Sequence, residues 1–147
     1  MSKEAKILIF SLNNEYYATD IIQVERILGY EEPTVLPEVP NFLEGVINYE
    51  NNILPIISLS RKFNFESQIS SDSKIIVIKD DDVKLGVTVD NVCEVTDINL
   101  DDIEVPPTVG SSISTRYIKG LIRLEDKIVI WLDLSKVLTE DEKEKMA

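Results

Sequence analysis

GVINYENNILPIISLSRKF, residues 45–63, recurs as GLIRLEDKIVIWLDLSKVL, residues 120–138, in an alignment without gaps. Each segment has an apolar run, a polar turn and a second apolar run, which is typical of a β-hairpin. Six of the nineteen aligned positions are identical, namely Gly45/Gly120, Ile47/Ile122, Glu50/Glu125, Ile53/Ile128, Leu59/Leu134 and Ser60/Ser135. Any two amphipathic hairpins look somewhat alike, but the order of loop types also repeats in both halves, which favours a duplication.

Short β-rich runs separated by turn residues cover most of the chain, and we expect five strands in each half. In the first half the expected strands are 6–12, 15–19, 24–30, 44–49 and 52–58. In the second half they are 74–79, 84–89, 92–96, 118–124 and 127–133. Short helices are expected at 20–23 and 59–63. The spacing Val24-x-x-Ile27 recurs as Val92-x-x-Val95, which supports the repeat.

The repeated strands predict an all-β fold made of two small five-stranded barrels. Each would hold about 65 residues, a size at which a single core is marginal, so the barrels gain stability by packing together. We expect one domain over residues 1–147, with subdomains at about 12–68 and about 69–138. The first strand, 6–11, could pair with either subdomain, and a C-terminal helix is expected at about 134–146. The seam between the barrels would leave a groove in which a partner helix can bind.

The net charge of −12 argues against two classes of partner. Nucleic-acid binding needs clustered basic residues that neutralise phosphates, and anionic lipid would repel this surface, so we expect no nucleic acid and no direct membrane insertion. No apolar run approaches the ~20 residues of a membrane-spanning helix, and the run 7–10 is too short for a signal peptide. We therefore expect a cytoplasmic protein, and a single cysteine, Cys93, gives no disulfide framework against this.

The chain contains no histidine, so the most common general base and the most common neutral metal ligand are both absent. Cys93 is expected in a strand and, without a histidine to form a thiolate pair, is expected to be buried and inert. The five glycines are widely scattered and form no phosphate-binding loop. We therefore expect no catalytic residue, no metal site and no cofactor.

Carboxylates can act without histidine, which leaves a carboxylate-dependent hydrolase as a remote alternative. The candidates are the aspartates at 80–82 and the acidic residues within 101–104. Calcium binding would need a glycine for a sharp turn, and the segment 80–84 has none. Turn chemistry explains both clusters more simply, because aspartate side chains bond locally to turn backbone.

Many short stretches follow one another in a definite order and spacing along the chain. These stretches are Phe10-Ser11-Leu12, Tyr17-Ala18, 20–27, Pro37, Pro40-x-Phe42, Gly45-Val46-Ile47-Asn48, Ile53-Leu54-Pro55-Ile56, Leu59, Gly86, Val89-Asp90-x-Val92, Pro106-Pro107, Tyr117-Ile118-x-Gly120 and Leu132-Asp133-Leu134. In the order and spacing of these stretches, rather than in any one of them, the sequence resembles the CheW family of chemotaxis coupling proteins over about residues 6–138.

This resemblance implies two SH3-like five-stranded barrels and a non-catalytic adaptor. It further implies a ternary assembly with the cytoplasmic tips of chemoreceptors and the regulatory domain of the histidine kinase CheA. The receptor helix would lie in the seam groove, and the protein would associate with membrane receptor arrays through its partners. When the family's partner-contact positions are matched to this sequence, the resemblance implies that Val24, Ile27 and Asn48 lie at or near partner surfaces.

At three places the sequence departs from the family pattern. Tyr49-Glu50-Asn51 stands where Leu-Arg-Gly is usual, Arg26 stands where Glu is usual, and Ser58 stands where Asp is usual. Because Arg26 and Glu50 have traded charges, we predict that they form a salt bridge at the partner-facing end of the first barrel. Both are therefore candidate partner-binding residues. The exchange also leaves an alternative function open, in which the same fold serves as an adaptor for a specialised or non-chemotaxis set of kinases and receptors.

Overall fold

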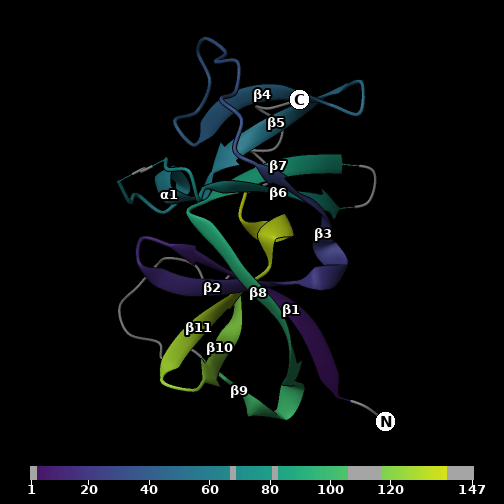
Figure 1. The fold of residues 1–147 in the computed structure, drawn as a ribbon, viewed down its shortest axis with the longest axis vertical. Helices are drawn as coiled ribbons and strands as arrows, with labels where there is room; N and C mark the ends of the chain where they lie inside the picture. Colours follow the sequence, from purple (N-terminus) through teal and green to yellow (C-terminus); the bar gives the residue numbers. More distant parts are fainter. Residues whose placement is uncertain (1–2, 67–68, 81–82, 106–116, 139–147) are drawn as a thin grey trace.

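The computed structural model describes residues 3–66, 69–80, 83–105 and 117–138, and these residues form two mixed β-sheets stacked one above the other (Figure 1). Sheet A has the strand order β8-β1-β2-β11-β10-β9, and sheet B has the order β3-β6-β7-β5-β4. An all-β fold with few helices is confirmed. In the described ranges, no helix has the length and apolar character needed to cross a bilayer.

The bounds of the elements agree closely with the expected strands. Sheet A contains β1 (Glu4–Leu12), β2 (Glu15–Asp20), β8 (Asn91–Asn99), β9 (Ile103–Glu104), β10 (Ile118–Leu124) and β11 (Lys127–Leu132). Sheet B contains β3 (Val24–Gly29), β4 (Leu43–Tyr49), β5 (Asn52–Ser58), β6 (Lys74–Asp80) and β7 (Val83–Val89). The short helices are α1 (Leu59–Lys62) and the 3₁₀ turns η1 (Ile21–Gln23), η2 (Leu100–Asp102) and η3 (Leu134–Lys136). Where a C-terminal helix is expected, at about 134–146, the structure describes only the 3₁₀ turn η3, and residues 139–146 of this prediction lie outside the described residues.

The duplicated hairpins have the same register. Gly45 pairs with Ile56 in the first hairpin, and Gly120 pairs with Trp131 in the second. Both residues of the second pair lie 75 positions after their counterparts in the first pair. Both hairpins carry an irregularity immediately before this glycine. Each is followed by a short helical turn, α1 in the first case and η3 in the second. The prediction that the two segments occupy equivalent hairpin-plus-helix positions is confirmed.

Each sheet takes strands from both halves of the chain. In sheet A, Ile9 pairs with Ala18 and with Glu94. In sheet B, Val77 pairs with Gly86 and with Arg26. Each of these residues is offset by 68 positions from its counterpart in sheet A, so the two sheets have equivalent pairings. The chain crosses to the other sheet after β2 and again after β7, so β1 and β2 join the later strands β8, β10 and β11, while β3, β4 and β5 join β6 and β7. The sheets therefore do not divide at residue 68, where the expected subdomains meet.

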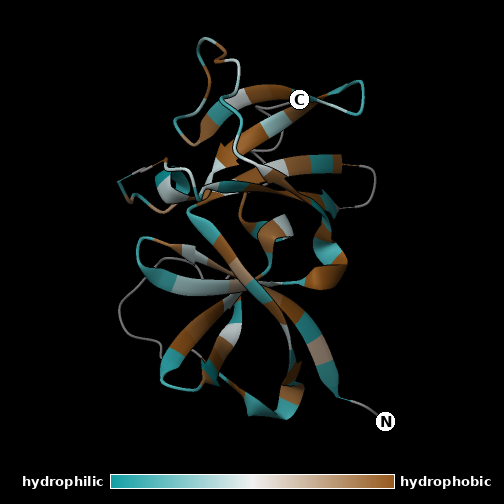
Figure 2. Ribbon diagram, viewed as in Figure 1, coloured by the Kyte–Doolittle hydropathy of each residue, from teal (hydrophilic) through white to brown (hydrophobic). Residues whose placement is uncertain are grey.

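The strands at the seam are buried on both faces, which explains their continuous apolar sequences. In β1, Ile7 and Ile9 pack inside sheet A, whereas Leu8 and Phe10 pack between the sheets. In β6, the run at 75–78 alternates in the same way between the inside of sheet B and the seam. Figure 2 shows hydrophobic residues concentrated on the strands and hydrophilic residues in the turns. Each fully buried aliphatic or aromatic side chain contributes roughly 1.5–3 kcal/mol through burial.

Gly45 fixes the proline-containing loop that leads into β4. Thr34 and Val46 exchange two backbone hydrogen bonds of 2.8 and 2.9 Å, which bring the loop against the strand. A Cβ atom at residue 45 would overlap the carbonyl oxygen of Thr34, and the φ angle of +150° also disfavours any other residue. A glycine is therefore required at this position.

Candidate partner-binding surface

Tyr49 joins the two outermost strands of sheet B. Its hydroxyl, at the end of β4, donates a 2.7 Å hydrogen bond to the Glu25 carboxylate on β3. The Arg26 guanidinium carbon lies 5.7 Å from the centre of the Tyr49 ring, within the range of a cation–π interaction. Because β3 and β4 are at opposite ends of the strand order, these side-chain contacts link the two outermost strands of sheet B.

Lys84, on β7, completes this cluster of charges. Its ammonium group lies 3.1 Å from the Glu25 carboxylate and 5.7 Å from the centre of the Tyr49 ring. The hydrogen bonds from Tyr49 and Lys84 lower the pKa of Glu25, so this carboxyl is ionised at neutral pH. Burial, together with hydrogen bonds to Glu25 and Glu50, raises the pKa of Tyr49, so the phenol stays protonated and can donate.

The predicted salt bridge between Arg26 and Glu50 is not formed, and this prediction is wrong. Both residues instead contact Tyr49, Arg26 through the ring and Glu50 through the hydroxyl. Within the described residues Arg26 takes part in no ion pair, so its charge is available to a partner.

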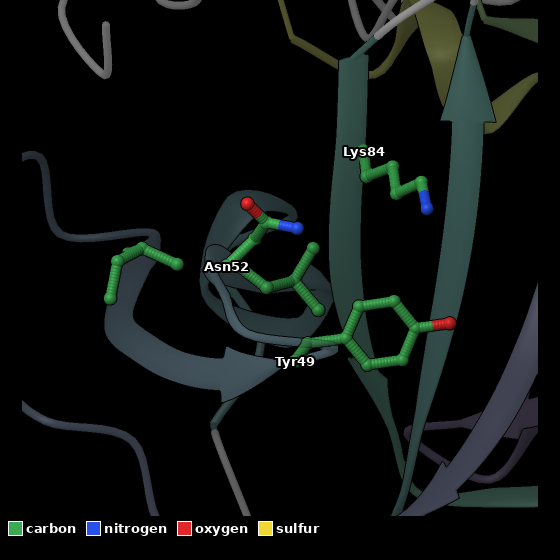
Figure 3. A pocket seen from close by; sticks show the side chains of 5 residues that line it. Tyr49, Asn52 and Lys84 are labelled. Atoms are coloured by element: carbon green, nitrogen blue, oxygen red, sulfur yellow. The ribbon is translucent and has the colours of Figure 1, made fainter.

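An open hollow of about 300 Å³ lies beside this cluster, lined by Tyr49, Asn52, Ile53, Leu54 and Lys84 (Figure 3). Ile53 is 71% exposed and stands opposite Asn48, which is also exposed, in the β4–β5 hairpin. Val83, at the start of β7, is 67% exposed. We call this area the Tyr49 surface, defined by Glu25, Arg26, Asn48, Tyr49, Glu50, Asn52, Ile53, Val83 and Lys84. It combines apolar side chains with charges of both signs, which suits a protein partner.

Val24 and Ile27 lie nearer than the Tyr49 surface to the seam between the two sheets. Val24 is partly buried and packs against the core between the sheets, whereas Ile27 is 39% exposed. Their counterparts in the second repeat behave alike, because Val92 packs against the same core and Val95 is 48% exposed. The edge strands β3 and β8 therefore each expose the second valine or isoleucine of the pair to solvent, and each packs the first against the core.

The sequence analysis singles out Arg26, Asn48 and Glu50, which lie on the Tyr49 surface, but it does not single out Glu25 and Lys84. Tyr49 had been noticed as a departure from the family pattern, yet its role as the link between strands was not foreseen. A tyrosine beside a charged turn gives a weak signal. Its contacts with β3 and β7 depend on how the sheet curls, which the local sequence does not specify.

Of the two acidic candidates for hydrolysis, the cluster at 80–82 includes Asp81 and Asp82, which lie outside the described residues, whereas the cluster within 101–104 is engaged in surface ion pairs. Glu104 accepts two hydrogen bonds of 3.1 Å from Arg123, and Asp101 lies 3.9 Å from Lys3. Among the described residues, no group of three or more acidic or cysteine side chains could hold a metal ion. The expectation that Cys93 is buried is wrong, because β8 is an edge strand and the thiol is exposed. Partial burial nevertheless raises the pKa of Cys93.

Comparisons with known proteins agree with this architecture over nearly the whole chain. A family model for the CheW-like domain matches residues 6–142. The chain is 31% identical to a chemotaxis protein CheW of Klebsiella aerogenes, covering 93% of this chain and 83% of that protein. It is 29% identical to a chemotaxis protein CheW of Treponema pallidum, covering 99% of this chain and 88% of that protein.

Among solved structures, the scaffolding protein TtCheW of Thermoanaerobacter tengcongensis superposes with a TM-score of 0.86 and 34% identity. The superposition covers 97% of this chain and 92% of that one. The fold and the family model agree over nearly the whole chain, and they do not favour the hydrolase alternative. The chain belongs to the CheW family of non-catalytic chemotaxis adaptors.

Proposed function

We propose that this protein couples the cytoplasmic tips of chemoreceptors to the regulatory domain of the histidine kinase CheA. The observation that carries the proposal is the match to a CheW scaffold over 97% of the chain. The protein would act in the cytoplasm and associate with membrane receptor arrays through these partners. Its role would be to hold both partners at once, so it needs two separate binding surfaces.

The Tyr49 surface is the area that we assign to the kinase domain. Asn48, Glu50 and Arg26 lie on it or at its edge, beside the exposed apolar side chains of Ile53 and Val83. A free guanidinium next to apolar area favours a partner that offers a carboxylate beside an apolar side chain. Like charges at such an interface cost several kcal/mol, so Arg26 and Glu50 would also reject partners with the opposite pattern.

The seam between the sheets is the area that we assign to the receptor. Ile27 on β3 and Val95 on β8 are exposed on edge strands of different sheets, and Val24 and Val92 support them from the shared core. Two apolar positions on either side of a seam suit one face of an amphipathic helix. The receptor tip supplies such a helix.

We also propose that each sheet closes into an SH3-like barrel. The hydrogen bond from Tyr49 to Glu25 supports closure of sheet B, because it joins the edges of that sheet. The boundary expected near residues 68 and 69 would then mark the junction between the two repeats, which exchange strands.

A specialised partner set is a second candidate. The observation that favours it is the charge exchange at Arg26 and Glu50, which sits on the surface assigned to the kinase domain. Under this proposal the protein would bind a kinase whose contact residues have exchanged charges in a matching way.

Sedimentation of a three-component mixture tests the coupling function. The mixture contains this protein, a helical hairpin from a receptor tip and a kinase regulatory domain. A single complex that contains all three components is expected. Strict competition between the receptor fragment and the kinase domain would overturn the proposal.

A further inference from the structure

Of the segments that pass between the two sheets, the one after β2 and the one after β11 lie next to each other. After β2 in sheet A, the three residues of η1 lead directly into β3 in sheet B. After β11 in sheet A, Asp133 begins η3, which leads to Val137 in the core between the sheets and Leu138 against sheet B. The turn that follows β11 lies between the two sheets (Figure 1). The relative placement of the sheets therefore depends on how these crossings are held.

The Gln23 side chain links the two crossings. Its Nε2 donates a 2.8 Å hydrogen bond to Asp133 Oδ1 and lies 3.5 Å from Ser135 Oγ. Its Oε1 accepts a 3.1 Å hydrogen bond from the Thr19 hydroxyl. Gln23 and Asp133 are 110 positions apart in the sequence, so this contact joins the first repeat to the second.

The surroundings allow one orientation of the amide. Burial opposes ionisation of Asp133, but hydrogen bonds from Gln23 and Ser135 outweigh it and lower the pKa of this carboxyl. An ionised carboxylate only accepts, so Gln23 must present its nitrogen to Asp133 and its oxygen to Thr19. Thr19 is fully buried and Asp133 is half-buried, so a wrong orientation would leave polar groups without partners.

We propose that Gln23 is a positioning residue that fixes sheet B relative to sheet A and so presents β3 to the receptor. This inference rests on the proposed coupling function. Val24, the first residue of β3, follows Gln23 directly, and Ile22, which precedes it, is 87% exposed. A receptor helix that contacts both β3 and β8 needs the two strands at a fixed separation. A lost link would let that separation vary and lower the fraction of molecules competent to bind.

The repeat provides a matched control. Asn91, 68 positions after Gln23, occupies the equivalent place before Val92, is exposed, and forms no side-chain hydrogen bond in the described part of the chain. Gln23→Met keeps the length of the side chain but removes every hydrogen bond of the link. Gln23→Lys keeps a donor for Asp133 but removes the acceptor for Thr19, so it tests the link to the second repeat alone. Gln23→Asn, whose amide is one methylene too short, is a second disrupting variant should Gln23→Met fail to fold.

Two measurements test the proposal on the full chain. Spin labels on Cys93 in sheet A and on Val83→Cys in sheet B report the distance distribution between the sheets, since both positions are exposed. Titration with a receptor-tip helical hairpin reports affinity. We expect Gln23→Met to broaden the distribution and weaken binding about tenfold, as when the competent fraction falls to about a tenth. For Gln23→Lys and Asn91→Met, the width of the distance distribution should match that of the parent protein. Their affinity for the receptor hairpin should lie within about twofold of the parent's.

The outcomes separate this inference from the proposed function. If Gln23→Met leaves either the distribution or the affinity unchanged, or if Gln23→Lys behaves like Gln23→Met, Gln23 is not a positioning residue. If the parent protein fails to bind the hairpin, the coupling function is overturned. In that case the distance distributions alone decide whether Gln23 holds the sheets in place.

Discussion

The Tyr49 hydroxyl and the Glu25 carboxylate are joined by a 2.7 Å hydrogen bond that spans the two edges of sheet B. Arg26 lies over the same ring, and Lys84 holds the same carboxylate from β7. Tyr49 thus connects β3 to the β4–β5 hairpin through its hydroxyl and its ring. The identity of residue 49 controls both the shape of this surface and the charge that it offers to a partner.

Tyr49→Phe should raise the pKa of Glu25 toward its usual value, because the hydroxyl is the largest contribution that lowers it. A carboxyl whose folded-state pKa is lowered stabilises the fold above its unfolded-state pKa, and this stability is lost as the pH falls through the folded-state value. The variant should therefore lose less stability than the parent protein between about pH 6 and about pH 3. Carboxyl NMR titration and urea unfolding measure the two effects. Tyr16→Phe is the control, and an unshifted Glu25 pKa in Tyr49→Phe would contradict the assignment.

Gly45→Ala should destabilise the protein by about 2–3 kcal/mol or more, because the added methyl meets the Thr34 carbonyl at a φ angle that favours glycine. Gly29→Ala is the matched control, since a Cβ there meets nothing within 4 Å. That variant should be neutral or slightly more stable. Urea unfolding of both variants provides the measurement. Equal stabilities would show that the loop before β4 shifts freely.

Glu44→Gln should stabilise the protein at neutral pH by about 1 kcal/mol. Glu44 is buried, and both its Oε1 and the nearby Thr88 hydroxyl have no hydrogen-bond partner within the described residues. Burial raises the pKa of Glu44, so its stabilising contribution is present at low pH and is lost as the pH rises through the folded-state value. The gain from Glu44→Gln should therefore vanish below about pH 4.

Urea unfolding at several pH values tests this sign. The exposed Glu31→Gln serves as the control and should show no such dependence. If the stability gained by Glu44→Gln instead grew as the pH fell, the surroundings would favour the ionised carboxylate of Glu44, and the prediction would be wrong.

Fragments 1–66 and 69–147 should each fail to fold alone and should assemble when mixed. Each sheet takes strands from both fragments, so neither fragment contains a complete sheet. Circular dichroism of the separate and mixed fragments, with size-exclusion chromatography of the mixture, measures this. A cooperatively folded single fragment would be inconsistent with the strand exchange.

The double variant with Arg26→Glu and Glu50→Arg should leave the melting temperature nearly unchanged, because both side chains are exposed and they form no ion pair with each other. Partner preference should change, because the charges at two positions of the Tyr49 surface are exchanged. Titration with a panel of kinase regulatory domains and receptor tips provides the comparison. Identical preferences in the parent and the variant would place the specificity elsewhere.

The sequence alone determined the strands, the hairpins and the repeat. Alternation of apolar and polar residues is local, so it specifies each strand, and the pairing of neighbouring strands follows from short turns. The matching registers of Gly45 and Gly120 were therefore predictable from two aligned segments. The family resemblance predicted Asn48 near a partner surface, and the charge exchange predicted Arg26 and Glu50 there; all three side chains are exposed.

The tertiary structure alone decided which sheet each strand joins and which side chains meet. The crossings after β2 and β7 depend on apolar faces far apart in the sequence, such as those of Phe10 and Ile78, that are buried together in one core. The same long-range packing exposes Cys93 on an edge strand and places Arg26 over the Tyr49 ring, where it forms no ion pair with Glu50. Local sequence fixes the direction of each side chain relative to its strand, but the curl and stacking of the sheets determine what that side chain contacts.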